Sequence, residues 1–199
     1  TSKLEKRGIK IIYQDNIESI PLTFRKKSVI VVFTPAIPIE NKQLLFFKNQ
    51  GNIIFKRSKI LGMITNKFKT IAIAGTHGKT TTAAILAHLF YQTKQSFTAF
   101  IGGVLNEFNS NIIINGNEYA IVEADEYDRS FLNLNPMIGC ITSIDSDHLD
   151  IYGSFKEVKR SFKEFIGKIK DKVIVSNELS INGISYSLNT KSDYYPKYL

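Results

Sequence analysis

The chain of 199 residues lacks most features that mark secreted, membrane or disulfide-built proteins. Its single cysteine, Cys140, excludes an internal disulfide and a zinc site built from cysteines. No run of eighteen apolar residues is present, so no membrane-spanning helix is expected. Residues 1–7 lack the apolar segment of a signal peptide, and the chain does not begin with methionine. We therefore expect a cytoplasmic globular protein whose sequence is a piece of a longer one.

Arginine-rich tracts and the aromatic patterns of RNA-binding domains are also missing, so nucleic-acid binding is not predicted despite the net charge of +8. The charge is uneven. Residues 1–67 carry 13 basic and 4 acidic residues, for a net charge of +9, whereas residues 68–199 carry 13 and 14, for −1. One interpretation is a front half that attracts an anionic ligand and a back half that holds metal ions. The alternative is biased codon usage, since lysine outnumbers arginine 21 to 5.

Hydrophobic patterning predicts the α/β class, with two modules of alternating strands and helices and a mainly parallel sheet. Residues 1–67 fit an incomplete Rossmann-like domain, because the strand and glycine-rich turn that usually open such a domain are not seen. A polar stretch at 66–69 predicts the boundary with a second module over residues 68–199. In the first module we expect strands at 8–13, 28–34 and 52–55 and helices at 40–50 and 58–65.

In the second module the alternation begins again. A hairpin is expected between residues 112–114 and 119–122, because Asn115-Gly116-Asn117 between them is a typical turn sequence. The remaining expected elements are strands at 70–74, 96–101, 137–144 and 172–175 and helices at 80–91 and 155–169.

A glycine loop joins the expected strand at 70–74 to the helix at 80–91. Glycines let backbone N–H groups surround phosphate oxygens, and the helix N-terminus adds partial positive charge. Lys79 supplies a full charge for the outer phosphates, and the Thr80 hydroxyl is a ligand for Mg²⁺. The loop is shorter than the general phosphate-loop formula, which has a glycine where Ile73 stands; the alternative is a glycine turn without a ligand. The pattern predicts nucleotide binding by Gly75, Thr76, His77, Gly78, Lys79, Thr80 and Thr81.

Acidic residues and a histidine follow two further expected strands. Glu123 opens a run of four acids in six residues, at a strand end where it can reach the Mg²⁺ of a nucleotide. His148 lies among three aspartates after the strand at 137–144, and a neutral imidazole can bind a second divalent ion. The alternatives are a solvated acidic turn and a structural hydrogen bond. Because parallel strands end at one edge of a sheet, we expect the loop, Glu123 and His148 to share one site.

Three segments together resemble the Mur ligases of peptidoglycan synthesis: 74–82 (AGTHGKTTT), 122–132 (VEADEYDRSFL) and 147–153 (DHLDIYG). The spacings from Lys79 to Glu123 and from Glu123 to His148 also agree with that family. The resemblance implies a partial N-terminal UDP-sugar-binding Rossmann-like domain at 1–67 and an incomplete central ATP-binding domain at 68–199. By comparison with that family, we expect this sequence to lack the start of the N-terminal domain and the whole C-terminal domain.

The resemblance also implies roles for individual residues. Lys79 would be catalytic and bind the β- and γ-phosphates, and Thr80 and Glu123 would hold one Mg²⁺. His148 would help to hold a second ion near the carboxylate substrate and is the other catalytic candidate. Weaker candidates for substrate contact are Gly102, Gly103 and Ser130.

The implied activity uses ATP and two Mg²⁺ ions to join L-alanine to the lactyl carboxylate of UDP-N-acetylmuramate through an acyl phosphate. These small molecules are the expected partners, with no nucleic acid and no membrane, and the oligomeric state stays open. One alternative keeps the chemistry but takes a murein tripeptide or another acceptor. Another is a non-catalytic remnant that binds nucleotide. We expect these 199 residues alone not to catalyse ligation.

Overall fold

The computed structural model describes residues 2–197 and divides into two compact units, with the division between Ile60 and Leu61. The sequence pattern places the domain boundary seven residues later, between residues 67 and 68. The difference arises at helix α3 (Arg57–Thr65), which continues across the division. Within the described residues, no helix is both long enough and apolar enough to cross a membrane.

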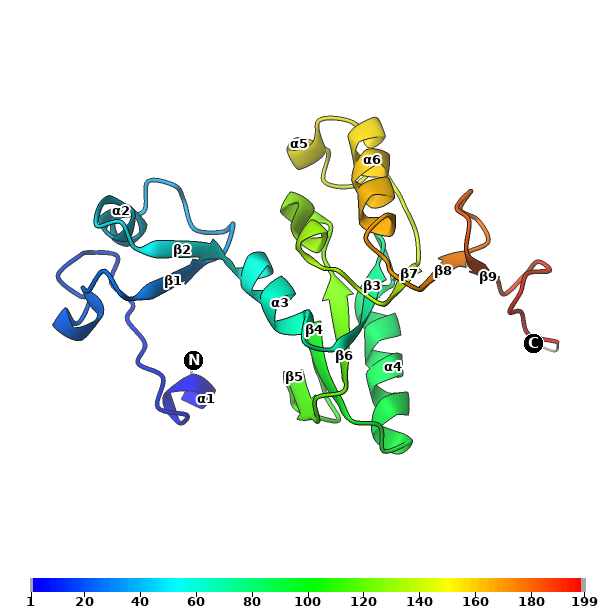
Figure 1. Ribbon diagram of the computed structural model, residues 1–199, viewed down its shortest axis with the longest axis horizontal. Coiled ribbons are helices and arrows are strands. Elements are labelled where there is room, and N and C mark those ends of the chain that lie inside the picture. Colours follow the sequence, from blue (N-terminus) through cyan, green and yellow to red (C-terminus); the bar gives the residue numbers. More distant parts are fainter. Residues whose placement is uncertain (1, 198–199) are drawn as a thin grey trace. The chain divides into compact units, whose positions relative to one another are not determined.

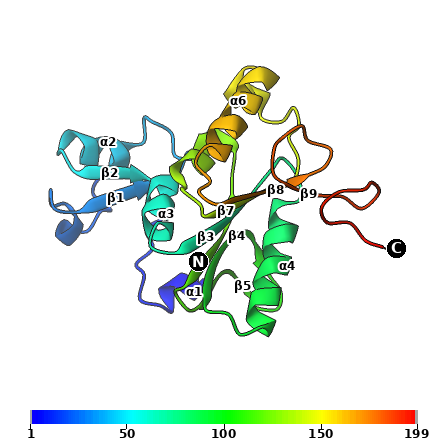
Figure 2. The same cartoon turned by 45° about the vertical axis from the view of Figure 1, so that its right-hand side comes forward.

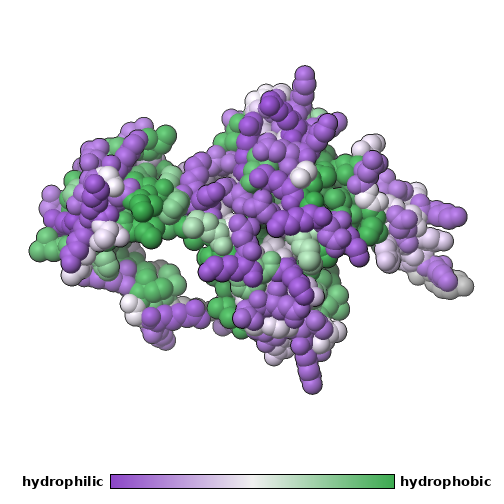
Figure 3. All heavy atoms as spheres, viewed as in Figure 1, coloured by the Kyte–Doolittle hydropathy of each residue, from purple (hydrophilic) through white to green (hydrophobic). Residues whose placement is uncertain are grey.

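The first unit contains a two-stranded parallel sheet, in which Ile30 of β1 pairs with Ile53 of β2. The prediction of a strand at residues 8–13 is wrong, because this segment forms neither helix nor strand. It has no place in the sheet, since β1 and β2 pair with each other and not with it. Ile30 and Ile53 are more than half exposed, and Figure 3 shows hydrophobic surface on this unit. The elements of the unit are α1 (Ser2–Glu5), η1 (Leu22–Phe24), β1 (Ile30–Phe33), α2 (Lys42–Asn49) and β2 (Ile53–Lys56).

The second unit is built on a seven-stranded sheet with the order β5-β4-β6-β3-β7-β8-β9 (Figure 1). All neighbouring strands are parallel except β4 and β5. The strands are β3 (Lys69–Ala74), β4 (Phe97–Leu105), β5 (Ser110–Asn115), β6 (Tyr119–Ala124), β7 (Ile138–Ile141), β8 (Lys172–Ser176) and β9 (Ile184–Tyr186). The helices are α4 (Lys79–Gln92), η2 (Tyr127–Asn133), α5 (Leu149–Tyr152) and α6 (Phe155–Ile166).

The hairpin expected between residues 112–114 and 119–122 is wrong. Strand β5 pairs antiparallel with β4, and β6 runs parallel between β4 and β3. The reason is burial: Ala120, Ile121 and Val122 are fully buried and therefore belong in the interior of a sheet covered on both faces. Strand β5 is mostly exposed, which suits the edge position that it occupies.

Helices cover both faces of this sheet, and the alternation of side chains along each strand decides which helix each residue contacts. On β3, Ala72 and Ala74 belong to a core with α6 and η2, whereas Ile71 and Ile73 belong to a core with α4. Figure 1 and Figure 2 show α4 and α6 on opposite sides of the sheet. The second unit is therefore a three-layer α/β fold, as the pattern of strands and helices predicts.

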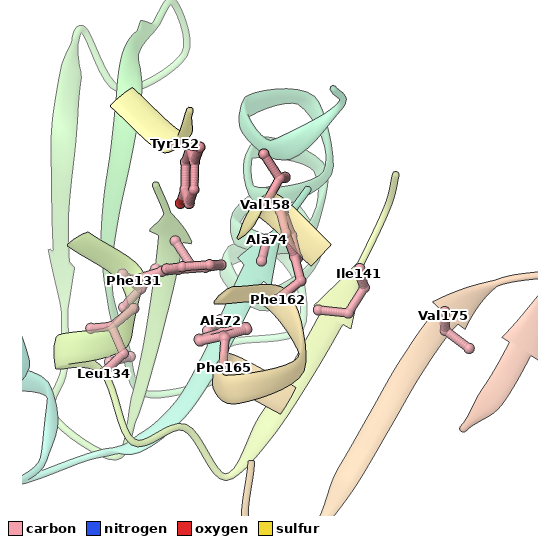
Figure 4. Close-up of a cluster of buried hydrophobic side chains, with 13 residues drawn as sticks. Ala72, Ala74, Phe131, Leu134, Ile141, Tyr152, Val158, Phe162, Phe165 and Val175 are labelled. Atoms are coloured by element: carbon pink, nitrogen blue, oxygen red, sulfur yellow. The ribbon is translucent and has the colours of Figure 1, made fainter. Parts of the chain in front are cut away.

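Helix α6 closes the first of these cores with one apolar face. It begins after Ser154, whose side chain accepts a hydrogen bond from the Glu157 backbone, and it ends at Ile166, three residues before the expected end. Phe162 and Phe165 on its buried face both pack against Phe131 of η2, with ring centroids 5.2 and 4.8 Å apart (Figure 4). This packing fixes η2, which begins within the acidic run, to the same face of the sheet as α6.

Candidate functional site

Three neighbouring strands of the second unit end at one edge of the sheet. Ala74, the last residue of β3, lies beside Ala124 of β6 and Ile141 of β7 in the strand register. The glycine loop, the acidic run and the segment with His148 each follow one of these strands. In α/β sheets of this kind, ligands bind beyond the carboxyl ends of the strands.

The first glycine of the loop, Gly75, occupies a position that other residues cannot adopt without strain. Its φ is +141°, and a Cβ atom there would lie 2.9 Å from the Ser143 backbone nitrogen and would collide with the Thr142 hydroxyl. The second glycine, Gly78, has φ of +81° and is the N-cap of α4. Glycine at both positions therefore lets the chain turn from β3 into the N-terminus of α4.

The segment after β7 holds the loop in shape. Ser143 accepts hydrogen bonds from two loop nitrogens, through its carbonyl from Thr76 (3.1 Å) and through its hydroxyl from His77 (2.9 Å). The Thr76 hydroxyl in turn accepts one from the Asp145 nitrogen (2.9 Å), and the Thr142 hydroxyl donates to the His77 carbonyl. The His77 imidazole is mostly exposed and lies 3.7 Å from an Asp145 carboxylate oxygen. These hydrogen bonds preorganise the loop. The His77 side chain is not among the groups that make them.

Lys79 begins α4 and turns back onto the loop. Its ammonium nitrogen donates to the carbonyls of Gly75 (2.6 Å) and Thr76 (3.2 Å) and to Glu126 Oε1 (3.0 Å). The distance from Nζ to Glu126 Oε2 is 2.8 Å, so the two side chains form an ion pair that is largely buried. The lysine expected to bind phosphate is therefore placed at the loop, with a carboxylate beside it.

Glu126 is a site residue that the sequence pattern did not single out. Its side chain is only 3% exposed, and its Oε2 atom, 2.8 Å from Lys79 Nζ, makes an ion pair but no regular hydrogen bond. Its backbone carbonyl accepts a hydrogen bond from the Tyr152 hydroxyl (2.6 Å), and burial raises the pKa of Tyr152, so that this donor stays protonated. The sequence signal that could have pointed to Glu126 is the acidic run, but all four of its acids are candidates for the site.

Thr80 and Glu123 meet next to Lys79. The Thr80 hydroxyl donates to Glu123 Oε1 over 2.8 Å, and Glu123 Oε2 accepts a hydrogen bond from the Gly102 nitrogen over 2.7 Å. A Cβ atom on Gly102 would lie 2.9 Å from the carboxylate, and one on Gly103 would lie 3.3 Å from the Thr80 methyl. Gly102 therefore makes room for Glu123 and Gly103 for Thr80, and the substrate contact expected of these two glycines stays a prediction.

His148 also lies near Glu126. Its Nε2 is 4.0 Å from Glu126 Oε1, and its ring packs edge-to-face against Tyr127 with 5.3 Å between centroids. The residue has φ of +54°, in the left-handed region, which is uncommon for a residue other than glycine. Glu126 thus connects His148 with Lys79 at this edge of the sheet.

Two other predicted residues lie at the periphery of these contacts. Ser130 is part of η2, and its carbonyl accepts a hydrogen bond from the Asn133 side chain (3.2 Å). Thr81 is exposed in the first turn of α4. The nucleotide contact expected of Thr81 and the substrate contact expected of Ser130 both remain predictions.

The residues present fit a magnesium ion that is also bound by phosphates. Within residues 2–197, no three His, Cys, Asp or Glu side chains gather into a metal cluster. Mg²⁺ needs no such cluster, because it is bound through one or two carboxylates together with phosphate and water oxygens. Thr80 and Glu123 supply two oxygen donors in contact with each other. This donor set is the hard, oxygen-rich kind that Mg²⁺ prefers.

A separate hollow lies in the first unit, with a volume of about 450 Å³. It is mainly apolar, and the side-chain oxygen of Gln50 in its lining is buried without a hydrogen-bond partner. The lining residues are Ile17, Lys42, Leu45, Phe46, Asn49 and Gln50.

Comparison with known proteins gives a consistent set of similarities. The model of the Mur ligase middle domain matches residues 73–193. The proteins named UDP-N-acetylmuramate–L-alanine ligase of Christiangramia forsetii and Flavobacterium johnsoniae are 45% and 43% identical, each over 98% of this chain. The chain spans 44% of the length of each of these two relatives.

Two solved structures are similar in fold. The UDP-N-acetylmuramate-alanine ligase of Thermotoga maritima matches with a TM-score of 0.80 and 24% identity, covering all of this chain and 46% of that one. The UDP-N-acetylmuramate:L-alanyl-gamma-D-glutamyl-meso-diaminopimelate ligase of Neisseria meningitides matches with a TM-score of 0.81 and 20% identity, covering 90% of this chain and 60% of that one.

Proposed function

The chain belongs to the Mur ligase family, and on this premise we propose that it supplies the ATP-binding centre of a ligase that joins L-alanine to UDP-N-acetylmuramate. The product of this reaction is a precursor of peptidoglycan, and we place the reaction in the cytoplasm. The choice of L-alanine follows the names of the curated relatives at 43–45% identity. A murein tripeptide as acceptor has less support, because two solved structures with that type of name are only 20% and 21% identical.

The observation that carries the proposal is the position of Lys79, Thr80 and Glu123. Lys79 follows a glycine loop at a helix N-terminus, which is an arrangement that binds phosphate. Thr80 and Glu123 lie in contact at the same strand ends, where a hydroxyl and a carboxylate can hold the Mg²⁺ of a nucleotide. We therefore assign the triphosphate of ATP to this loop.

In the proposed reaction, a lactyl carboxylate oxygen of the sugar nucleotide attacks the γ-phosphorus of ATP. The bond from the γ-phosphorus to the bridging oxygen breaks, ADP leaves, and an acyl phosphate forms. The alanine amine then attacks the acyl carbon, phosphate leaves, and the amine loses a proton. The first step brings an anion towards a triphosphate, so that charge repulsion is its main barrier.

The residues of this chain act on that repulsion. Lys79 places a positive charge at the loop, where it stabilises charge on the transferring phosphoryl group. The N-terminus of α4 holds the phosphates in line for attack. Thr80 and Glu123 would hold one Mg²⁺ and His148 would help to hold a second, and such ions neutralise phosphate charge when bound. The first unit is proposed to take part in binding the UDP-sugar.

Two experiments test the proposal. Isothermal titration calorimetry with the purified chain should show binding of MgATP that depends on Mg²⁺. A chimera with residues 1–199 in place of the matching segment of the Flavobacterium johnsoniae ligase should release phosphate with UDP-N-acetylmuramate and L-alanine. Release with murein tripeptide in place of L-alanine would favour the other acceptor. Absence of MgATP binding by the folded chain would contradict the proposal.

A further inference from the structure

The ammonium group of Lys79 has three N–H donors, and each has an acceptor within the protein. Two acceptors are carbonyls of the loop itself, at Gly75 and Thr76, and the third is the carboxylate of Glu126. A phosphate group that binds to Lys79 must therefore replace at least one of these bonds. Which bond is replaced depends on how costly each acceptor is to leave without a partner.

Glu126 is the acceptor that is most costly to abandon. Its side chain is 3% exposed, and the Lys79 ammonium lies within 3.0 Å of both carboxylate oxygens, so that Lys79 is the main source of compensation for its negative charge. The imidazole of His148 lies farther away, at 4.0 Å from Oε1. Removing the partner of a buried charge is strongly destabilising, whereas a loop carbonyl is neutral.

We propose that Glu126 is a positioning residue that anchors the Lys79 ammonium at the phosphate loop and, through its negative charge, lowers the affinity of the site for MgATP. This inference rests on the proposed function, because it assumes that the loop binds the phosphates of ATP. When nucleotide binds, the loop carbonyls release Lys79 and Glu126 keeps it.

The negative charge of Glu126 should weaken the binding of the triphosphate. Glu126 and the triphosphate are both negative and both approach the same ammonium group, so that they repel each other across it. Unit charges a few ångströms apart at a partly buried site change a binding constant by on the order of tenfold or more. Neutralising Glu126 should therefore tighten MgATP binding, although the substitution removes a contact of the phosphate-binding lysine. General damage to the site would weaken binding instead.

The test is calorimetric titration of MgATP into the purified chain, with far-UV circular dichroism as a check that each variant is folded. Glu126→Gln keeps the size of the side chain and should lower the Kd about tenfold. The matched control is Glu118→Gln, which removes the same charge from another lysine pair, with Lys69 (2.9 Å), at the opposite ends of β3 and β6.

The outcomes separate the two proposals. If the unsubstituted chain binds MgATP and folded Glu126→Gln binds it equally or more weakly, the anchoring role is wrong and the proposed function stands. If Glu118→Gln tightens binding as much as Glu126→Gln, the effect is one of general charge and the anchoring role is also wrong. If the unsubstituted chain does not bind MgATP, both proposals fail. Should Glu126→Gln not fold, Glu126→Met removes the charge with a side chain of similar length, and the same tightening is required of it.

Discussion

Replacing Gly75 by alanine tests whether the glycine loop has the conformation that the structure gives it. The backbone of Gly75 has φ of +141°, which an L-residue rarely adopts. The new Cβ atom would collide with the Thr142 hydroxyl and lie 2.9 Å from the backbone nitrogen of Ser143. The hydroxyl can rotate away, but the backbone nitrogen belongs to the segment that holds the loop and cannot.

The expected loss of stability has two parts. Strain at an unfavourable φ costs about 1–3 kcal/mol, and overpacking against fixed atoms costs about 1–3 kcal/mol more. Gly153→Ala provides the control, because Gly153 also has positive φ (+74°) but no atom lies within 4 Å of the position that its new methyl group would take. That variant should bear only the first cost. We therefore expect Gly75→Ala to be less stable than Gly153→Ala by about 2 kcal/mol.

Urea unfolding followed by circular dichroism at 222 nm measures the difference, since the chain contains no tryptophan for fluorescence. With slopes of about 1–3 kcal/mol per molar urea, a difference of 2 kcal/mol moves the midpoint by roughly 1 M. Equal midpoints for the two variants would refute the close approach of the β7 segment to the loop. Calorimetry on the same samples should show that MgATP binding is lost in Gly75→Ala and kept in Gly153→Ala.

The further predictions concern three single side chains. Lys79→Met should abolish measurable MgATP binding in calorimetry. Because it leaves Glu126 buried without its cation, it should also lower the free energy of unfolding, measured in urea, by about 3–5 kcal/mol. A variant as stable as the unsubstituted chain would contradict the buried ion pair. Glu123→Gln should raise the Mg²⁺ concentration for half-maximal ATP binding by about tenfold, and an unchanged Mg²⁺ requirement would remove Glu123 from the metal site. Burial raises the pKa of Cys140 to about 11, so the folded chain should not react with Ellman's reagent at pH 8 and should do so only in denaturant. Because the unfolded thiol ionises near pH 9 and the folded one near 11, the Cys140 contribution to stability should fall as the pH rises from 9 to 11.

The strands of the second unit could be predicted from the sequence because their apolar runs are buried on both faces. Residues 70–74, 119–122 and 172–175 all lie within observed strands. Their neighbours could not be predicted, since an apolar run does not say which strand it pairs with. The error at residues 112–122 has this origin: a good turn sequence favoured a local hairpin, whereas burial of both faces of β6 favoured a central position between β3 and β4. In residues 8–13 the apolar pattern was present but a pairing partner was not.

The position of Glu123 could be derived from strand geometry alone. Side chains alternate between the two faces of β6, so Glu123 shares the face of Ile121, which belongs to the core with α4. Thr80 lies in the first turn of that helix, and the observed 2.8 Å contact joins the two. The alternation therefore selects Glu123 from the acidic run as the partner of Thr80.

The same rule fails for Glu126, because β6 ends at Ala124 and no regular period continues beyond it. The chain turns instead through Asp128 and Arg129, both with positive φ, and the direction of Glu126 depends on that turn and on the Tyr152 bond to its carbonyl. Two acids only three residues apart thus serve different neighbours: Glu123 meets the hydroxyl of Thr80, and Glu126 meets the ammonium of Lys79. Lys79 and Thr80, which are consecutive at the start of α4, therefore contact different carboxylates. Substitution of one carboxylate or the other can thus change the affinity for the metal ion and the position of the lysine independently.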